Sequence, residues 1–218
     1  MIHNLSDHNS LLNNILAEIR DVKTQSDPLR FRRNLERCGE IFAYEISKTL
    51  SYENKDVITP LGTAGVSVFA NKIVLATILR AGLPIHHGFL NYFDRAENAF
   101  ISAYRVYDKG GSFTIKFEHI SSPGIKGKTV ILSDPMMATG ASAVMAYKAL
   151  REKGTPKHTH IVSVIASKEG IEYVRQNLPM QKTSIWVGAI DDELTSKAYI
   201  VPGLGDAGDL AFGSKTVD

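Results

Sequence analysis

The sequence predicts an α/β fold, with a mostly parallel sheet flanked by helices, from three observations. From Val57 onward, short β-branched runs alternate with segments of helical periodicity, the order expected when helices join parallel strands. The runs are continuously apolar, as in IVLATIL at Ile73–Leu79, which is typical of strands buried on both faces. Apolar residues make up 44% of the 218-residue chain, enough to bury a sizeable core.

Two helices are predicted ahead of the sheet, within about residues 8–50. The first spans Ser10–Arg20, where apolar residues recur on one helical face. The second begins at Asp27-Pro28, an N-cap followed by proline at the first helical position, and runs to about Leu50. We expect both helices to pack on the core or on a second subunit.

The other elements follow in order along one domain, residues 1–218. Strands are expected at Ile73–Leu79, Phe100–Tyr104, Thr129–Leu132, His160–Ala166 and Ser184–Ile190. Helices are expected at Leu83–Phe93, Ala141–Lys153 and Glu169–Leu178. Over about residues 104–123, a Lys-Gly-Gly-Ser turn followed by an alternating run predicts a β-hairpin arm that leaves the sheet.

Composition argues against several classes of protein. The net charge of +2 provides no basic stripe, so we expect neither a nucleic-acid partner nor a membrane surface. The longest apolar run is far shorter than the roughly 20 residues of a membrane-spanning helix, and the polar N-terminus has no signal-peptide core. The lone cysteine, Cys38, is expected to be a small buried hydrophobe. These features predict a soluble cytoplasmic protein.

The stretch TVILSDPMMATGAS, Thr129–Ser142, has the features of a ligand site. The apolar run ends at Asp134, and ligands of open α/β sheets bind beyond the carboxyl ends of the strands. Thr139–Ser142 coincide with the start of a helix, where free N–H groups and the helix dipole favour an anion. A sugar phosphate would suit this combination of phosphate site and carboxylate. An ordinary capped helix is the alternative interpretation.

Two further stretches are candidates for the same site. Arg80 ends a strand beside a glycine turn and could bind a second anion, although by itself it is better interpreted as a surface arginine. The segment YIVPGLGDAGDLAF, Tyr199–Phe212, is too rich in glycine for a helix or a central strand. Its apolar residues indicate an ordered loop, whose main-chain groups could recognise the edge of a flat heterocycle.

Other motifs are weaker. Gly127-Lys128-Thr129 lacks the first glycine of a P-loop, and the GxGxxG match at Gly203–Gly208 lacks the following helix and acidic residue of a dinucleotide site. The paired histidines, His86-His87 and His158 with His160, are poor zinc ligands because no cysteine or acid accompanies them. Asp191-Asp192-Glu193 is better interpreted as the start of a helix than as a metal cluster.

Three separated motifs together resemble those of the uracil phosphoribosyltransferase family. They are Leu79–Gly82 with Tyr104-Arg105, Asp134–Ser142, and YIVPGLGDAGD, and their order matches over about Ile73–Gly213. The resemblance implies a phosphoribosyltransferase-type sheet with a β-arm and a uracil-binding loop over about residues 199–212. It also implies the reaction of uracil with 5-phosphoribosyl 1-diphosphate to give UMP and diphosphate.

The resemblance further implies roles for individual residues. Asp134 would hold the ribose hydroxyls, Arg80 and Arg105 the diphosphate, and residues 138–142 the 5′-phosphate. The full set implied to contact phosphoribosyl diphosphate is Arg80, Arg105, Asp134, Pro135, Met136, Met137, Ala138, Thr139, Gly140, Ala141, Ser142 and Asp206. Uracil would be bound, largely through the main chain, by Ile200, Gly205, Asp206 and Ala207. Mg²⁺ would arrive with the diphosphate, without a direct protein ligand.

Asp206 and Arg105 are the residues to which the resemblance implies catalytic roles. Arg105 would neutralise the leaving diphosphate, and Asp206 would help uracil N1 lose its proton through water. Pro135 and Ala138 depart from the acids common at these positions in the wider superfamily, a change that uracil enzymes share. The apolar N-terminal helices favour a homodimer or tetramer, and a GTP effector stays open.

Three alternatives to this function are weighed. An RNA-binding regulator on the same fold would need a basic stripe that the near-neutral charge does not provide. A phosphoribosyltransferase for another base, such as a purine, is disfavoured by the glycine-rich C-terminal loop. A nicotinamide dehydrogenase is disfavoured by the missing helix after Gly208.

Overall fold

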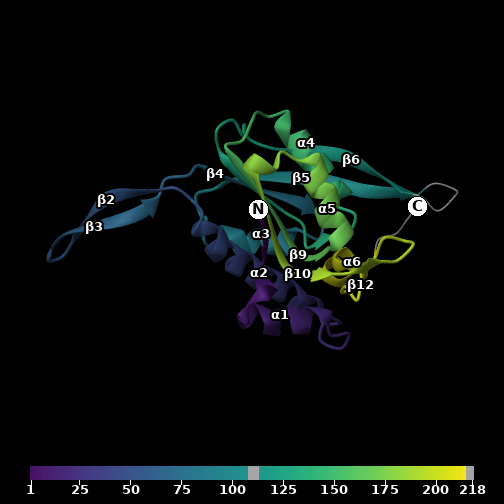
Figure 1. Cartoon of the computed structure of the whole chain (residues 1–218). Coiled ribbons are helices and arrows are strands. Elements are labelled where there is room, and N and C mark those ends of the chain that lie inside the picture. The colour runs from purple at the N-terminus through teal and green to yellow at the C-terminus, as the bar shows by residue number, and fades with distance from the viewer. Residues whose placement is uncertain (108–112, 215–218) are drawn as a thin grey trace.

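The computed structural model describes residues 1–107 and 113–214, with side chains described except at 103–107 and 113–118. Among these residues, an eight-stranded sheet forms the centre (Figure 1). Its strands lie in the order β1 (Ile2–Asn4), β10 (Thr183–Asp191), β9 (His158–Ser167), β7 (Thr129–Ser133), β4 (Ile73–Leu79), β5 (Glu97–Tyr107) and β6 (Phe113–Ser121), with β8 (Met136–Met137) paired to β9. Its pairings are parallel except that of β5 with β6. The predicted fold class is confirmed.

Local capping signals set where the N-terminal helices begin. α1 (Leu11–Arg20) follows Ser10, whose hydroxyl accepts a hydrogen bond from the Leu12 N–H, and α2 (Pro28–Ser47) follows the Asp27 cap. The remaining helices are α3 (Leu83–Leu90), α4 (Ala141–Arg151), α5 (Lys168–Asn177) and α6 (Ala207–Phe212), with 3₁₀ turns η1 (Leu5–Asp7) and η2 (Met180–Lys182). In the described part of the chain, none of these helices has both the length and the apolar character needed to cross a membrane.

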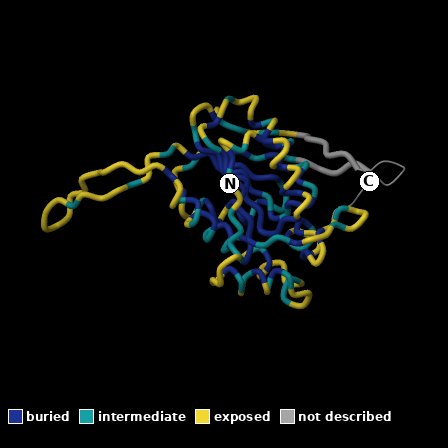
Figure 2. Tube along the Cα trace, viewed as in Figure 1, coloured by how far each residue is buried: buried dark blue, intermediate teal, exposed yellow. Residues whose placement is uncertain are grey.

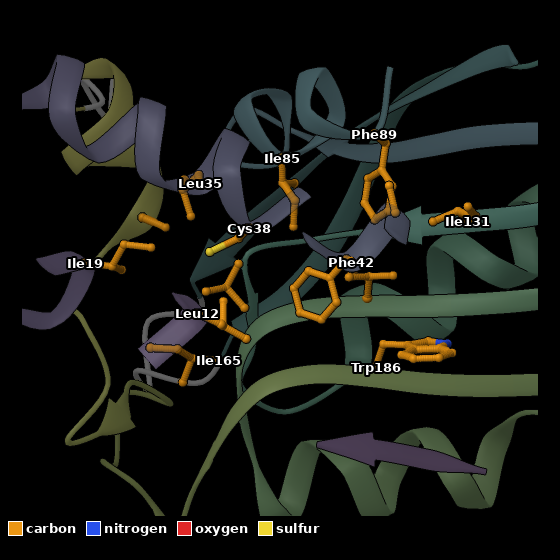
Figure 3. Close-up of a cluster of buried hydrophobic side chains, with 14 of the residues drawn as sticks. Leu12, Ile19, Leu35, Cys38, Phe42, Ile85, Phe89, Ile131, Ile165 and Trp186 are labelled. Atoms are coloured by element: carbon orange, nitrogen blue, oxygen red, sulfur yellow. The ribbon is translucent and has the colours of Figure 1, made fainter. Parts of the chain in front are cut away.

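Helices cover both faces of the sheet, and alternate residues of one strand face opposite layers. In β4, Ile73 and Leu75 belong to the core formed with α1, α2 and α3, whereas Val74 and Ala76 belong to the core formed with α4 and α5. Figure 3 shows the first core, in which Cys38 lies among apolar side chains. Cys38 is buried as predicted, and burial raises the pKa of its thiol far above the usual range. Two-sided burial therefore explains the continuously apolar strands.

The predicted hairpin arm is formed by β5 and β6, and it begins inside the sheet. β5 pairs in parallel with β4 up to the Leu79–Ser102 position and antiparallel with β6 from the Phe100–Ser121 position onward. The strand is consequently longer than the predicted Phe100–Tyr104. The predicted turn, residues 109–112, lies outside the described residues.

A second hairpin, which the sequence analysis missed, projects from the molecule (Figure 1). It consists of β2 (Tyr52–Thr59) and β3 (Gly62–Phe69), paired antiparallel. Nearly every residue of the hairpin is exposed, as Figure 2 shows. Because neither strand has a buried face, the hairpin carries no core-facing apolar pattern. Its β-branched residues on both sides of the turn were the signal available.

The histidines of β9 are packed within the structure. The indole Nε1–H of Trp186 donates a hydrogen bond to His160 Nδ1 at 3.0 Å, and His3 stacks on Trp186 with ring centroids 3.8 Å apart. Burial, followed by the proximity of His158 and His3, lowers the pKa of His160 to about 3. His160 is thus neutral in the folded protein at ordinary pH.

The buried His160 is expected to make stability fall with decreasing pH. Between pH 6.5 and about 3, the unfolded chain binds a proton at this imidazole and the folded chain does not, so acidification favours unfolding. The free energy of unfolding should fall by up to about 1.4 kcal/mol per pH unit from this group. Urea unfolding at pH 7, 6 and 5 measures the free energy of unfolding. It should fall less steeply with decreasing pH in His160→Gln, whose side chain cannot titrate, than in the wild type. Equal slopes would contradict this account.

Candidate active site

The carboxyl ends of β4 and β7 lie side by side and bring Arg80 and Asp134 to one edge of the sheet. The two strands pair up to the Thr77–Ser133 position, where Thr77 Oγ1 donates a hydrogen bond to the Ser133 carbonyl at 3.3 Å. Gly82, in the turn after Arg80, packs so closely that an added Cβ would lie 3.2 Å from the same carbonyl oxygen. Residues predicted from separate stretches are therefore neighbours in the fold.

Residues 134–142 connect β7 to α4 and are held against α5. Gly140 has a φ of +74°, a left-handed conformation that suits glycine, immediately before the helix. The Ser167 hydroxyl donates a hydrogen bond to the Ala138 carbonyl at 2.5 Å. Gly170 lies so near that an added Cβ would be 2.4 Å from that oxygen. The path of this connection is thus set by contacts with β9 and with the first turn of α5.

The start of α4 has the features of an anion site. Gly140, the residue at the N-cap, provides no side-chain cap. The neighbouring Thr139 hydroxyl accepts only a long hydrogen bond, 3.4 Å, from the Ala141 N–H. The N–H groups of the first turn and the helix dipole can therefore act on a phosphate placed there.

The C-terminal segment is more regular than predicted. β11 (Glu193–Leu194) pairs antiparallel with β12 (Ile200–Val201), and α6 begins after Asp206, whose carboxylate accepts the Asp209 N–H at 3.0 Å. The prediction that glycine excludes a helix here was wrong for residues 207–212, because this cap and two buried alanines stabilise a short helix. The residues between β12 and α6 are irregular.

Arg80 joins the strand edge to this segment. Its Nη2 donates hydrogen bonds to Asp209 Oδ1 and to the Gly213 carbonyl, both at 3.2 Å. The Arg80 and Asp209 side chains are 38% and 41% exposed, so water screens the ion pair. Arg80 Nε is buried and has no partner among the described residues. The guanidinium is thus placed between the two halves of the site, in a pairing that an anionic ligand could replace.

Arg105 lies on β5, three positions beyond Ser102, which is opposite Leu79 at the same edge of the sheet. Its side chain lies outside the described residues, so the role that the sequence analysis gives it stays a prediction.

The acidic run that follows β10 does not begin a helix, contrary to prediction. Asp191 is the last residue of β10, and Glu193 lies in β11. The Asp191 carboxylate pairs with Arg20, and Asp192 pairs with Lys168 at 2.6 Å. No group of three or more metal-binding side chains occurs among residues whose side chains are described. The pairing of Arg20 with Asp191 could not be predicted from the sequence, because the two residues are 171 positions apart in the chain.

Structural comparison identifies the fold. The chain superimposes on the AQ2163 protein from Aquifex aeolicus with a TM-score of 0.87, at 29% identity and covering 100% of both chains. A hypoxanthine phosphoribosyltransferase from Staphylococcus aureus shares the fold, with a TM-score of 0.50 at 12% identity over 75% of this chain and 76% of that one. The fold is therefore that of the phosphoribosyltransferase class.

Sequence comparison defines the family. The profile described as uracil phosphoribosyltransferase matches residues 5–214. A protein of that name from Porphyromonas gingivalis is 58% identical over 99% of each chain, and one from Pyrococcus furiosus is 41% identical over 91% of this chain and 84% of its own. The chain belongs to the uracil phosphoribosyltransferase family.

Gly170→Ala is expected to strain the connection at residues 134–142. The new Cβ would meet the Ala138 and Met137 carbonyl oxygens at 2.4 and 2.7 Å, so backbone must shift. Such overpacking should lower the free energy of unfolding by about 1–3 kcal/mol. Gly124→Ala is the matched control, because its Cβ would meet only the Lys153 carbonyl at 3.9 Å. Urea unfolding of both variants tests this, and equal stabilities would contradict it.

Proposed function

We propose that the protein transfers the 5-phosphoribosyl group of phosphoribosyl diphosphate to N1 of uracil, giving UMP and diphosphate. The observation that carries this function is the meeting of three features at one edge of the sheet. Asp134 directly follows β7, residues 134–142 lead into the first turn of α4, and Arg80 contacts the C-terminal segment. Family membership supports the same reaction.

The phosphoribosyl end of the substrate would occupy the connection between β7 and α4. Main-chain N–H groups of residues 138–142 would bind the 5′-phosphate, with the Thr139 and Ser142 hydroxyls adding hydrogen bonds. The Asp134 carboxylate would accept hydrogen bonds from the ribose hydroxyls. Arg80 would exchange Asp209 for the diphosphate, and Arg105 would reach it from β5.

Uracil would lie against the C-terminal segment. Ile200, Gly205 and Ala207 would present main-chain groups to its carbonyl and N–H edge, next to Asp206. The main chain is restrained on both sides of Gly205, because Ile200 lies in β12, Ala207 begins α6, and both side chains are buried in the core. The fixed order of donors and acceptors would therefore select the base.

Catalysis would come from positioning and charge stabilisation. The bond from ribose C1 to the diphosphate oxygen breaks as the bond from C1 to uracil N1 forms, through a transition state with positive charge on the sugar. Arg80 and Arg105 would stabilise the negative charge that develops on the diphosphate. Asp206 would take up the N1 proton through water, and Asp134 would hold the ribose in line.

Mg²⁺ is the cofactor we propose, delivered with the diphosphate. Magnesium bound to substrate phosphates usually keeps several waters and needs few protein ligands. Of the acidic side chains here, Asp134 is assigned to the ribose, Asp206 to the N1 proton and Asp209 pairs with Arg80, so the ion would be held through the diphosphate without a direct protein ligand. When bound, the ion would add positive charge to the leaving diphosphate.

Assembly, regulation and location stay predictions. A homodimer or tetramer is supported by exposed apolar residues on the projecting hairpin, such as Ile58 and Leu61, which are 90% and 100% exposed. A cytoplasmic location is a prediction from the sequence, with which the buried, unpaired Cys38 is compatible because it fits a reducing compartment, and a GTP effector stays open.

Asp134→Asn is expected to reduce UMP formation. The amide is nearly isosteric but cannot accept charge-assisted hydrogen bonds from the ribose hydroxyls, so kcat/KM should fall about 100-fold or more. The assay mixes protein, uracil, phosphoribosyl diphosphate and Mg²⁺ and measures UMP after separation. The exposed Asp94→Asn is the matched control and should retain activity. Activity at the wild-type level in Asp134→Asn would contradict the assigned role.

Cytosine is expected to be a poor substrate. It replaces one carbonyl of uracil with an amino group and lacks the N3 proton, so a main-chain edge matched to uracil would face unpaired groups. The ratio of kcat/KM for uracil to that for cytosine should be roughly 1,000 or more. A base panel that includes cytosine and purines measures it, and comparable turnover of both pyrimidines would contradict recognition by the main-chain edge.

A further inference from the structure

An ion pair outside the substrate-contacting residues holds the C-terminal segment in place. Arg20, the last residue of α1, meets Asp191, the last residue of β10, through two hydrogen bonds, Nη1 to Oδ2 at 2.8 Å and Nη2 to Oδ1 at 2.7 Å. Such a paired arrangement fixes the orientation of both groups as well as their distance.

The same pair binds both main-chain polar groups of Gly203. Its N–H donates a hydrogen bond to Asp191 Oδ2, and its carbonyl accepts one from Arg20 Nη1, each at 2.9 Å. Gly203 lies between Ile200 and residues 205–207, the two parts of the segment that would contact uracil. The ion pair therefore fixes the Gly203 main chain, which lies in the middle of the segment proposed to bind uracil.

The backbone conformation at Gly203 is also tightly restricted. Gly203 has a φ of +57°, and an added Cβ would lie 2.1 Å from the Ile200 carbonyl oxygen. The chain therefore turns tightly here, and the direction of the peptide groups around Gly203 sets where residues 205–207 lie. On the other side, the Ile200 and Leu204 side chains are buried in the core. The segment is held by ionic contacts on one side and apolar contacts on the other.

Burial separates this pair from ordinary surface ion pairs. The Asp191 side chain is 6% exposed and that of Arg20 is 25% exposed, so solvent screens their interaction little. Replacing the whole of a buried pair with apolar groups often costs little stability, whereas removing one partner leaves a charge unpaired. The role of this pair is therefore better inferred from the geometry that it imposes on Gly203 than from its contribution to stability.

We propose that Arg20 and Asp191 are positioning residues for the uracil-binding main chain, an inference that rests on the function proposed above. Neither residue touches the base in this scheme. The doubly hydrogen-bonded pair that they form orients the Gly203 peptide groups, and thereby the N–H and C=O groups of residues 205–207. Loosening this ion pair lowers affinity for uracil, and it leaves the phosphoribosyl diphosphate contacts of Arg80 and of residues 134–142 largely unchanged.

Steady-state kinetics of Arg20→Lys and Asp191→Asn test the proposal. A lysine ammonium keeps the charge but cannot bond both carboxylate oxygens and the Gly203 carbonyl in the same planar geometry. We expect the KM for uracil to rise about tenfold or more. The KM for phosphoribosyl diphosphate should stay within about twofold of wild type, since Asp134, residues 138–142 and Arg80 would supply most of its contacts. A fall in kcat is expected to accompany the higher uracil KM, because Asp206 moves with the same segment.

Arg30→Lys is the matched control. Arg30 also bonds both oxygens of one carboxylate, through Nε and Nη2 to Glu18 at 2.8 and 2.7 Å, and these two hydrogen bonds join α1 to α2. Its variant should leave both KM values unchanged. Thermal unfolding of all three variants accompanies the kinetics, so that a general loss of stability is separated from a selective loss of uracil affinity.

The outcomes are distinct. A selective rise in the uracil KM in Arg20→Lys supports the proposal, even if Asp191→Asn fails to fold. Unchanged uracil KM in a folded Arg20→Lys, or an equal rise in both KM values, overturns it and leaves the pair a structural role. Wild-type protein that makes no UMP overturns the proposed function, and the positioning role with it.

Discussion

Burial of the central sheet on both faces is the constraint on which the rest of the structure depends. With helices packed on each side, the central strands β4, β7 and β9 have almost no solvent-facing positions along which polar groups could be arranged. Polar chemistry is therefore confined to the places where strands end. Because the central strands are parallel, their carboxyl ends meet at one edge, and Arg80, Asp134 and Asp191 follow or end three of them. The site is a consequence of the way the core is enclosed.

The edge keeps its shape through main-chain contacts. The Ala138 carbonyl accepts a hydrogen bond from the Ser167 hydroxyl, and that hydroxyl in turn accepts one from the Gly170 N–H. The connection between β7 and α4, which would hold the phosphate, thus packs against the first turn of α5. A site assembled in this way needs small residues at the contacts, and tolerates variation at side chains that point elsewhere.

Two ion pairs hold the C-terminal segment, and their different exposure indicates different tasks. The pair of Arg80 with Asp209 is partly open to water, so a charged substrate can replace it at modest cost. The pair of Arg20 with Asp191 is largely enclosed and also binds Gly203, so under the proposed function it would stay in place while substrates bind and leave. The Arg80–Asp209 pair is thus suited to replacement by a substrate, and the Arg20–Asp191 pair to holding the Gly203 main chain in one orientation.

The sequence by itself determined the sheet class, most helices and strands, and the stretches around Arg80, Asp134 and Asp206, since each depends on periodicity, caps or motifs within about a dozen neighbouring residues. It did not reveal the exposed β2–β3 hairpin, which has no buried face to create a pattern, or α6, whose cap and buried alanines outweigh its glycine content. Only the tertiary structure decided that Arg20 meets Asp191, 171 residues away, and that both hold Gly203. A contact of that separation leaves no local pattern, because it exists only after the helices and the sheet have packed.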